Sequence, residues 1–84
     1  TIELYMRAGE KDKALQIANV LGKRADEMAG YIIRKNYGIT LDLRRNLFIL
    51  ADLQRIMAEN DMPEQATFYE QAYERHVATL ERTR

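Results

Sequence analysis

The chain has 84 residues, which is enough for one domain with a modest hydrophobic core. Hydrophobic residues make up 46% and charged residues 31%, a composition typical of globular rather than disordered chains. Lys plus Arg and Asp plus Glu both number 13, and this balance argues against a nonspecific nucleic-acid binder and against strong recruitment to anionic lipid.

The first predicted helix spans residues 2–8. Ile2, Leu4, Tyr5 and Ala8 are its apolar members, and Gly9 follows, where a helix often ends in the left-handed conformation. The segment has the pattern of the last turns of a longer helix. Because the sequence also opens directly in helix-like residues, we expect the chain to be a fragment of a longer protein.

The second predicted helix spans residues 11–35. Apolar residues at spacings of three and four define the row that we expect to face the core: Ala14, Ala18, Leu21, Ala25, Met28 and Ile32. We expect Gly22 and Gly30 to lie off this row, where each costs about 1 kcal/mol relative to alanine. Whether the helix bends or breaks near Gly22 stays open. Residues 36–38 then supply turn chemistry.

The third predicted helix, over residues 41–59, is the most apolar, so we expect it to lie centrally. Thr40 is the expected N-cap. Its apolar residues form two adjacent rows, with Phe48 beside them: Leu43, Leu47, Leu50 and Met57, then Ile49, Leu53 and Ile56. On the polar face, Asp42 can pair with Arg45, and Arg55 can pair with both Asp52 and Glu59.

The fourth predicted helix spans residues 63–81. Asp61 is the expected cap, and Pro63 fits a first turn, where its missing N–H costs nothing. The expected inner row is Ala66, Tyr69, Tyr73, His76 or Val77, and Leu80. Since no segment alternates like a strand and the connections are short, the sequence predicts an all-α fold. We expect antiparallel helical hairpins, either repeat-like or in a four-helix up-down arrangement with a truncated first helix.

The first hairpin resembles half of a tetratricopeptide repeat. Tyr5, Gly9 and Ala14 have the offsets of that family's aromatic, glycine and alanine positions, whereas Ala18 and Leu21 depart from its pattern. The second hairpin is less similar, since Asp61 replaces the glycine and the two alanine positions do not keep the family's period of about 34 residues. The resemblance implies helical hairpins that mediate protein contacts.

The whole chain is also similar, without a specific motif, to the soluble C-terminal part of certain large bacterial polytopic membrane proteins. These are described as glycosyltransferase-like, with repeat-like tails. That resemblance implies an accessory domain whose parent chain would hold it at a membrane. Direct membrane insertion of this segment is not expected, since its longest apolar run, residues 47–51, falls far short of the roughly 18 needed.

No residues form a recognisable catalytic, cofactor or metal site, and neither a cofactor nor a small-molecule substrate is predicted. The absence of serine and cysteine excludes those nucleophiles. His76, the single histidine, is expected to be a buried or half-buried packing residue rather than a base or ligand, because such roles need convergent partners. We therefore do not expect an enzyme.

The residues expected to contact a partner lie in three places. Leu4 and Tyr5 would expose apolar surface if the first helix is truncated. Tyr37, Arg44 and Arg45 surround the turn after the second helix, together with residues 34–35, and could form a basic corner, although cations near helix ends are also commonly only solvated.

Phe68, off the inner row of the fourth helix, is the third place. We expect a non-catalytic helical interaction or spacer module that contacts other parts of a parent chain, a protein partner or a second copy. The two alternatives are an accessory domain of a membrane-bound glycosyltransferase-like protein and a nucleic-acid-binding domain built on Arg44 and Arg45.

Overall fold

The computed structural model describes residues 2–82, and all regular structure in this range is helical. The four helices are α1 (Ile2–Arg7), α2 (Lys11–Arg34), α3 (Leu41–Glu59) and α4 (Pro63–Arg82). Each expected helix is present, with ends within one residue of those predicted. The molecule is elongated, measuring 43 × 19 × 15 Å, because α2 alone is about 36 Å long at the usual helical rise.

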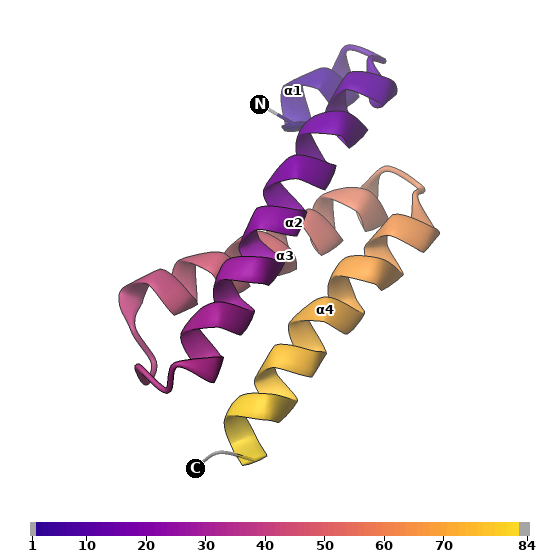
Figure 1. Ribbon diagram of the computed structural model, residues 1–84. Helices are drawn as coiled ribbons and strands as arrows, with labels where there is room; N and C mark the ends of the chain where they lie inside the picture. The colour runs from indigo at the N-terminus through magenta and orange to yellow at the C-terminus, as the bar shows by residue number, and fades with distance from the viewer. Residues whose placement is uncertain (1, 83–84) are drawn as a thin grey trace.

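The helix α3 was expected to be central, but it is α2 that packs against all three other helices. The helix α3 packs against both α2 and α4, while α2 also contacts α1 and, less extensively, α4. In Figure 1, α1 lies against the first turns of α2, and α4 lies on the other side of α2. The α2–α3 pair is therefore flanked by α1 on one side and by α4 on the other.

Three helices end in the same way. Gly9, Asn36 and Asp61 have left-handed φ angles of 78°, 57° and 57°. After each, the next residue's N–H donates back to a carbonyl in the last turn: Glu10 to Tyr5 at 2.9 Å, Tyr37 to Ile32 at 3.4 Å, and Met62 to Met57 at 2.9 Å. This is the Schellman arrangement, which satisfies carbonyl groups that the helix leaves unpaired.

The predicted role of Gly9 is thus confirmed, and that of Asp61 is wrong. Asp61 does not cap the start of α4; it occupies the left-handed position that ends α3. Thr40 does cap α3, since its hydroxyl accepts from the N–H of Leu43 at 3.1 Å. Asp61 and Thr40 were both expected to cap the start of a helix, and only Thr40 does. Asp tolerates the left-handed conformation that ends a helix, whereas a β-branched Thr does not.

The buried face of α2 differs from the expected row. The helix runs unbroken through Gly22, and its buried residues are small apart from the last: Ala14, Ala18, Gly22, Ala25, Ala29 and Ile32. Leu21 and Met28, which we expected inside, are 37% and 45% exposed. The other four residues of the expected row are buried as predicted, and Gly22 and Ala29 take the places expected for Leu21 and Met28.

The surroundings of Gly22 explain this difference. It lies under the ring of Tyr69 from α4 and beside Leu53 from α3: a Cβ at this position would overlap the tyrosine ring and come within 3.3 Å of the Leu53 Cδ1 atom. Absence of a side chain lets both neighbouring helices approach α2 closely. The expectation that Gly22 lies off the core face is therefore wrong.

The hydrophobic core has two parts. The larger one joins all four helices and includes Ile2, Met6, Leu50, Leu53 and Tyr69, with Tyr5 packed against it. The smaller one, near the α2–α3 turn, consists of Ala29, Ile32 and Leu43. On α4, Ala66 and Tyr69 are buried as expected, and Ala72, outside the expected row, is fully buried too.

Candidate functional site

Polar contacts across helices are few and lie at the edges of the core. On the α4 side, His76 Nε2 lies 2.6 Å from Asp26 Oδ1 on α2. The imidazole is half-buried, with 14% of its side chain exposed, and the Arg75 guanidinium lies 3.9 Å from the same carboxylate oxygen. His76 thus has a polar partner in addition to its packing role.

In this His–Asp pair the carboxylate can orient the imidazole, as it does in a catalytic triad. A triad requires a nucleophile held beside the histidine, and the chain has neither serine nor cysteine. Within residues 2–82, no group of three histidine, cysteine or acidic residues could hold a metal ion. The His76–Asp26 contact joins α4 to α2.

Two further hydrogen bonds join α4 to the α2–α3 pair. The Tyr69 hydroxyl donates to Asn19 Oδ1 on α2 at 3.4 Å, and burial raises the pKa of Tyr69. Gln54 of α3 donates to Glu70 of α4 at 2.9 Å. The α2–α3 pair is therefore covered by α4 through both apolar and polar contacts.

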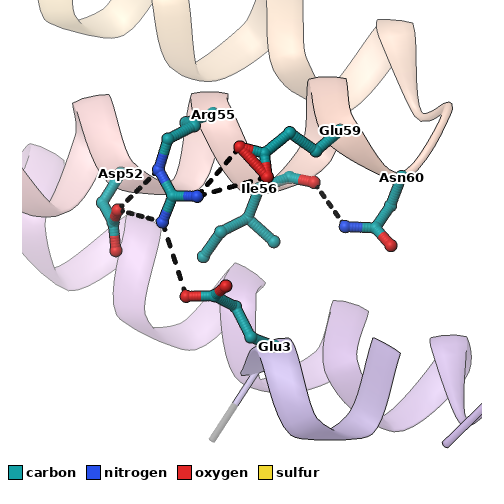
Figure 2. A network of polar contacts seen from close by, with 6 residues as sticks. All are labelled: Glu3, Asp52, Arg55, Ile56, Glu59 and Asn60. Atoms are coloured by element: carbon teal, nitrogen blue, oxygen red, sulfur yellow. Dashed lines mark hydrogen bonds and ion pairs between the residues drawn. The ribbon is translucent and has the colours of Figure 1, made fainter. Parts of the chain in front are cut away.

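On the opposite side, Arg55 of α3 connects to α1 (Figure 2). Its guanidinium donates to Asp52 at 2.7 Å, to Glu59 at 2.9 Å and, across the helix interface, to Glu3 at 3.4 Å. Hydrogen bonds to Asp52 and Glu59 raise the pKa of the Arg55 guanidinium, so it stays charged. The predicted pairs of Arg55 are confirmed, whereas Asp42 and Arg45 form no ion pair in the described part of the chain.

The short α1 covers only part of this side. On α2, residues 17, 21, 24, 28 and 31 share one flank, because they recur at helical spacing. At its α1 end, Ile17 is half-buried against the core cluster that contains Ile2 and Met6. Farther along the same flank, Leu21, Met28 and Tyr31 are exposed. This apolar flank is therefore partly buried near the start of α2 and exposed farther along the helix.

One face of the α3 helix also changes along its length, from a residue that contacts α1 to one that is exposed. Phe48, Asp52 and Arg55 share one flank by their spacing of four and three residues. At one end Arg55 contacts α1, and at the other Phe48 is 69% exposed. The exposed part of this α3 face is therefore centred on Phe48.

We call Leu21, Met28 and Tyr31 of α2 together with Phe48 of α3 the open face. Phe48 also borders a shallow hollow of about 460 Å³, formed with Ile49, Arg44 and Arg45. Large exposed apolar side chains that gather on a surface commonly mark a contact surface, and these four residues are the candidates for one here. This is the candidate functional site of the described chain.

The structure separates the residues expected to contact a partner. Arg44 and Arg45 lie beside Phe48 at one part of the open face. The Tyr37 ring packs against Tyr31 at another part, with 6.5 Å between the two ring centroids. Lys35 lies 5.7 Å from the Tyr31 ring centroid. That these residues form one basic corner stays a prediction.

The remaining expected residues lie elsewhere. Leu4 is exposed on α1, whereas Tyr5 is half-buried against the core and offers little free surface. Phe68 is exposed on α4, packs edge-on against Tyr69 and borders a separate hollow with Asn19. Sequence reasoning missed the open face because it assigned Leu21 and Met28 to the core. The regular recurrence of alanine and glycine one position away was the signal that could have corrected it.

Comparisons of the chain with protein-family models, with curated proteins and with solved structures found no match. No helix within residues 2–82 combines the length and the apolar character needed to cross a bilayer. The proposed function therefore rests on the open face and on the contacts around it.

Proposed function

We propose that this chain is a non-catalytic helical interaction module, and that the open face is the surface through which it contacts another protein surface, in a parent chain or in a partner. The observation that supports this is that the flank of α2 lined by Leu21, Met28 and Tyr31 continues from Ile17, which packs against the core, yet is exposed. Burial of a large apolar side chain contributes roughly 1.5–3 kcal/mol, so covering this face would be favourable.

The described geometry supports binding over catalysis. The one half-buried His–Asp contact joins two helices, and Arg44 and Arg45 border an apolar hollow rather than a polar cleft. An apolar centre with charged groups at its rim is the usual anatomy of a protein–protein interface. The tetratricopeptide resemblance remains part of this proposal, since that family uses helical hairpins in the same way.

Self-association of the isolated chain tests the proposal, because an uncovered apolar face promotes contact between copies. Sedimentation equilibrium over a wide concentration range should show reversible association. A variant combining Leu21→Gln, Met28→Gln and Phe48→Gln should be monomeric over that range and should retain its helical circular dichroism.

The matched control changes three exposed apolar residues outside the open face: Leu4→Gln, Val20→Gln and Phe68→Gln. All three are about as exposed as Phe48. The control should associate like the unmodified chain. A strictly monomeric unmodified chain, or equal weakening by both triple variants, would show that the open face is not the contact surface.

A further inference from the structure

The two turns at the ends of α3 carry opposite charges. Residues 34–45, around the α2–α3 turn, hold four basic side chains and one acidic one, whereas residues 59–70, around the α3–α4 turn, hold four acidic side chains and no basic one. The two turns lie at opposite ends of α3 (Figure 1), about 28 Å apart at the helical rise. Exposed charges act over roughly 8–10 Å in physiological salt, so the two turns cannot neutralise each other within one molecule.

The basic end carries a projecting apolar side chain. Phe48 is 69% exposed and lines an apolar hollow together with Ile49, Arg44 and Arg45. The side chains of the two arginines form no hydrogen bond or ion pair within residues 2–82. They lie near the N-terminal end of α3, where the helix dipole disfavours a cation. A surface that brought carboxylates to this end would therefore relieve an unfavourable charge while it buried the phenyl ring.

The acidic end has a hollow instead. The last turns of α3 and the first turns of α4 border about 500 Å³ of open space at this end. Gln54 donates to Glu70 at 2.9 Å and holds that carboxylate at the edge of the hollow. The Asp61 carboxylate also borders the hollow and has no partner within the described residues. The apolar lining consists of small residues: Ala58, Pro63 and Ala66.

The two ends are thus complementary, since one offers a phenyl ring between arginines and the other a hollow between carboxylates. Resting on the proposed function, in which Phe48 belongs to the contact surface, we propose that the occupant of the basic end is the acidic end of a second copy of this chain. Phe48 of one copy enters the α3–α4 hollow of the next, and Arg44 and Arg45 pair with Asp61 and Glu70. An apolar centre with charged groups around it is the usual anatomy of a protein–protein interface.

This contact is head-to-tail, because it joins two different surfaces of the chain. Each pair of copies keeps one free basic end and one free acidic end, so association continues beyond a dimer unless a ring closes. A symmetric contact between two basic ends is disfavoured, because it brings the arginines of both copies together.

Charge reversal at each end tests the proposal. The basic-end variant combines Arg44→Glu with Arg45→Glu, and the acidic-end variant combines Asp61→Asn with Glu70→Lys. All four side chains are exposed, and Asn tolerates the left-handed conformation of residue 61, so both variants should keep their helical circular dichroism. In sedimentation equilibrium, each variant alone should associate at least about tenfold more weakly than the unmodified chain, because like charges then face each other.

An equimolar mixture of the two variants should associate again, because each reversed end now meets a reversed partner. Adding Phe48→Gln to both members should abolish this recovery, which attraction between net charges alone would not explain. Lys11→Glu with Lys23→Glu is the matched control, since it changes the net charge as the basic-end variant does, at exposed positions elsewhere. It should associate like the unmodified chain.

The absence of cysteine allows the pairing to be measured directly. When Arg45→Cys and Thr67→Cys chains are mixed and mildly oxidised, the disulfide between the two different chains should form faster than either disulfide between identical chains. Thr67 borders the α3–α4 hollow, and a Lys23→Cys chain should react slowly with both. A contact between two basic ends would instead favour the Arg45→Cys homodimer and would overturn the proposal.

The remaining outcomes separate this inference from the proposed function. If the triple glutamine variant loses association while the basic-end variant behaves like its control, or while the mixture does not recover, copies meet the open face through another surface and only the head-to-tail contact is overturned. If the triple glutamine variant associates like the unmodified chain, the open face is not the contact surface. A chain that is monomeric at every concentration overturns both.

Discussion

The two sides of the α2–α3 pair are built differently. On the α4 side, the Tyr69 ring covers Gly22, and His76 and Gln54 hold polar contacts between helices. On the α1 side, cover extends only to about Ile17 and Arg55, beyond which Met28 and Phe48 are exposed. The comparison shows that large apolar side chains here mark the uncovered side, while small ones mark the closest helix contacts.

The largest expected effect compares two neighbouring positions on α3. Leu50→Ala should lower the free energy of unfolding by about 2–5 kcal/mol, because Leu50 is fully buried and the change leaves a cavity. Phe48→Ala should change it by less than about 0.5 kcal/mol, because the larger side chain is exposed. Urea unfolding of both variants checks the contrast, and similar losses would mean that Phe48 is covered.

The second effect concerns the close approach at Gly22. Gly22→Ala should destabilise by about 1–3 kcal/mol, because its methyl group would overlap the Tyr69 ring. Gly30→Ala is the matched control. Its methyl group would meet only the end of the flexible Arg34 side chain at 3.2 Å and His76 Cε1 at 3.6 Å.

The control variant should therefore gain up to about 1 kcal/mol from its higher helix propensity. In a Tyr69→Ala background, Gly22→Ala should become neutral or stabilising relative to Tyr69→Ala alone. Thermal or urea unfolding of the double-mutant cycle measures the coupling. Absence of coupling would show that the tyrosine ring does not require the glycine.

The α4 side should also weaken at high pH. Burial raises the pKa of Tyr69, so the folded protein holds this proton more tightly than the unfolded chain. The resulting stability is fully present below the ordinary tyrosine pKa of about 10 and is lost as pH rises through the raised value.

Tyr69→Phe should remove this component of the alkaline loss, whereas Tyr37→Phe, at an exposed tyrosine, should not. Unfolding midpoints of the three proteins between neutral and strongly alkaline pH measure the difference. Parallel curves for all three proteins would contradict the buried state of Tyr69.

The smallest expected effect compares the turns that carry α1 and α4. Gly9 and Asp61 occupy the same left-handed position. A side chain in the left-handed conformation destabilises the folded protein by about 1–2 kcal/mol, and by less when it is Asp. Glycine avoids this strain but loses about 0.5–1 kcal/mol of stability, because its unfolded chain has more conformational entropy. Asp61→Gly should thus stabilise by about 0.5 kcal/mol, and Gly9→Asp should destabilise. Thermal unfolding checks both signs, and a loss of stability in Asp61→Gly would indicate an unrecognised role for its carboxylate.

The sequence alone determined the all-helical class and the ends of the helices, because those depend on neighbouring residues. Gly9 and Pro63 act within a few residues of their own positions through backbone conformation, as does the hydroxyl of Thr40. The sites of the turns could therefore be predicted from local chemistry, although the role of Asp61 could not.

Only the tertiary structure decided which flank of α2 is buried. The rows through Leu21 and Met28 and through Gly22 and Ala29 lie one residue apart, and helical spacing fits both. The choice was made by Tyr69, 47 positions away from Gly22, whose ring needs a backbone without a side chain beneath it. Local pattern predicted the four residues that the two rows share: Ala14, Ala18, Ala25 and Ile32. Because the fit at Gly22 depends on two helices far apart in the chain, local pattern could not predict that Leu21 and Met28 are exposed.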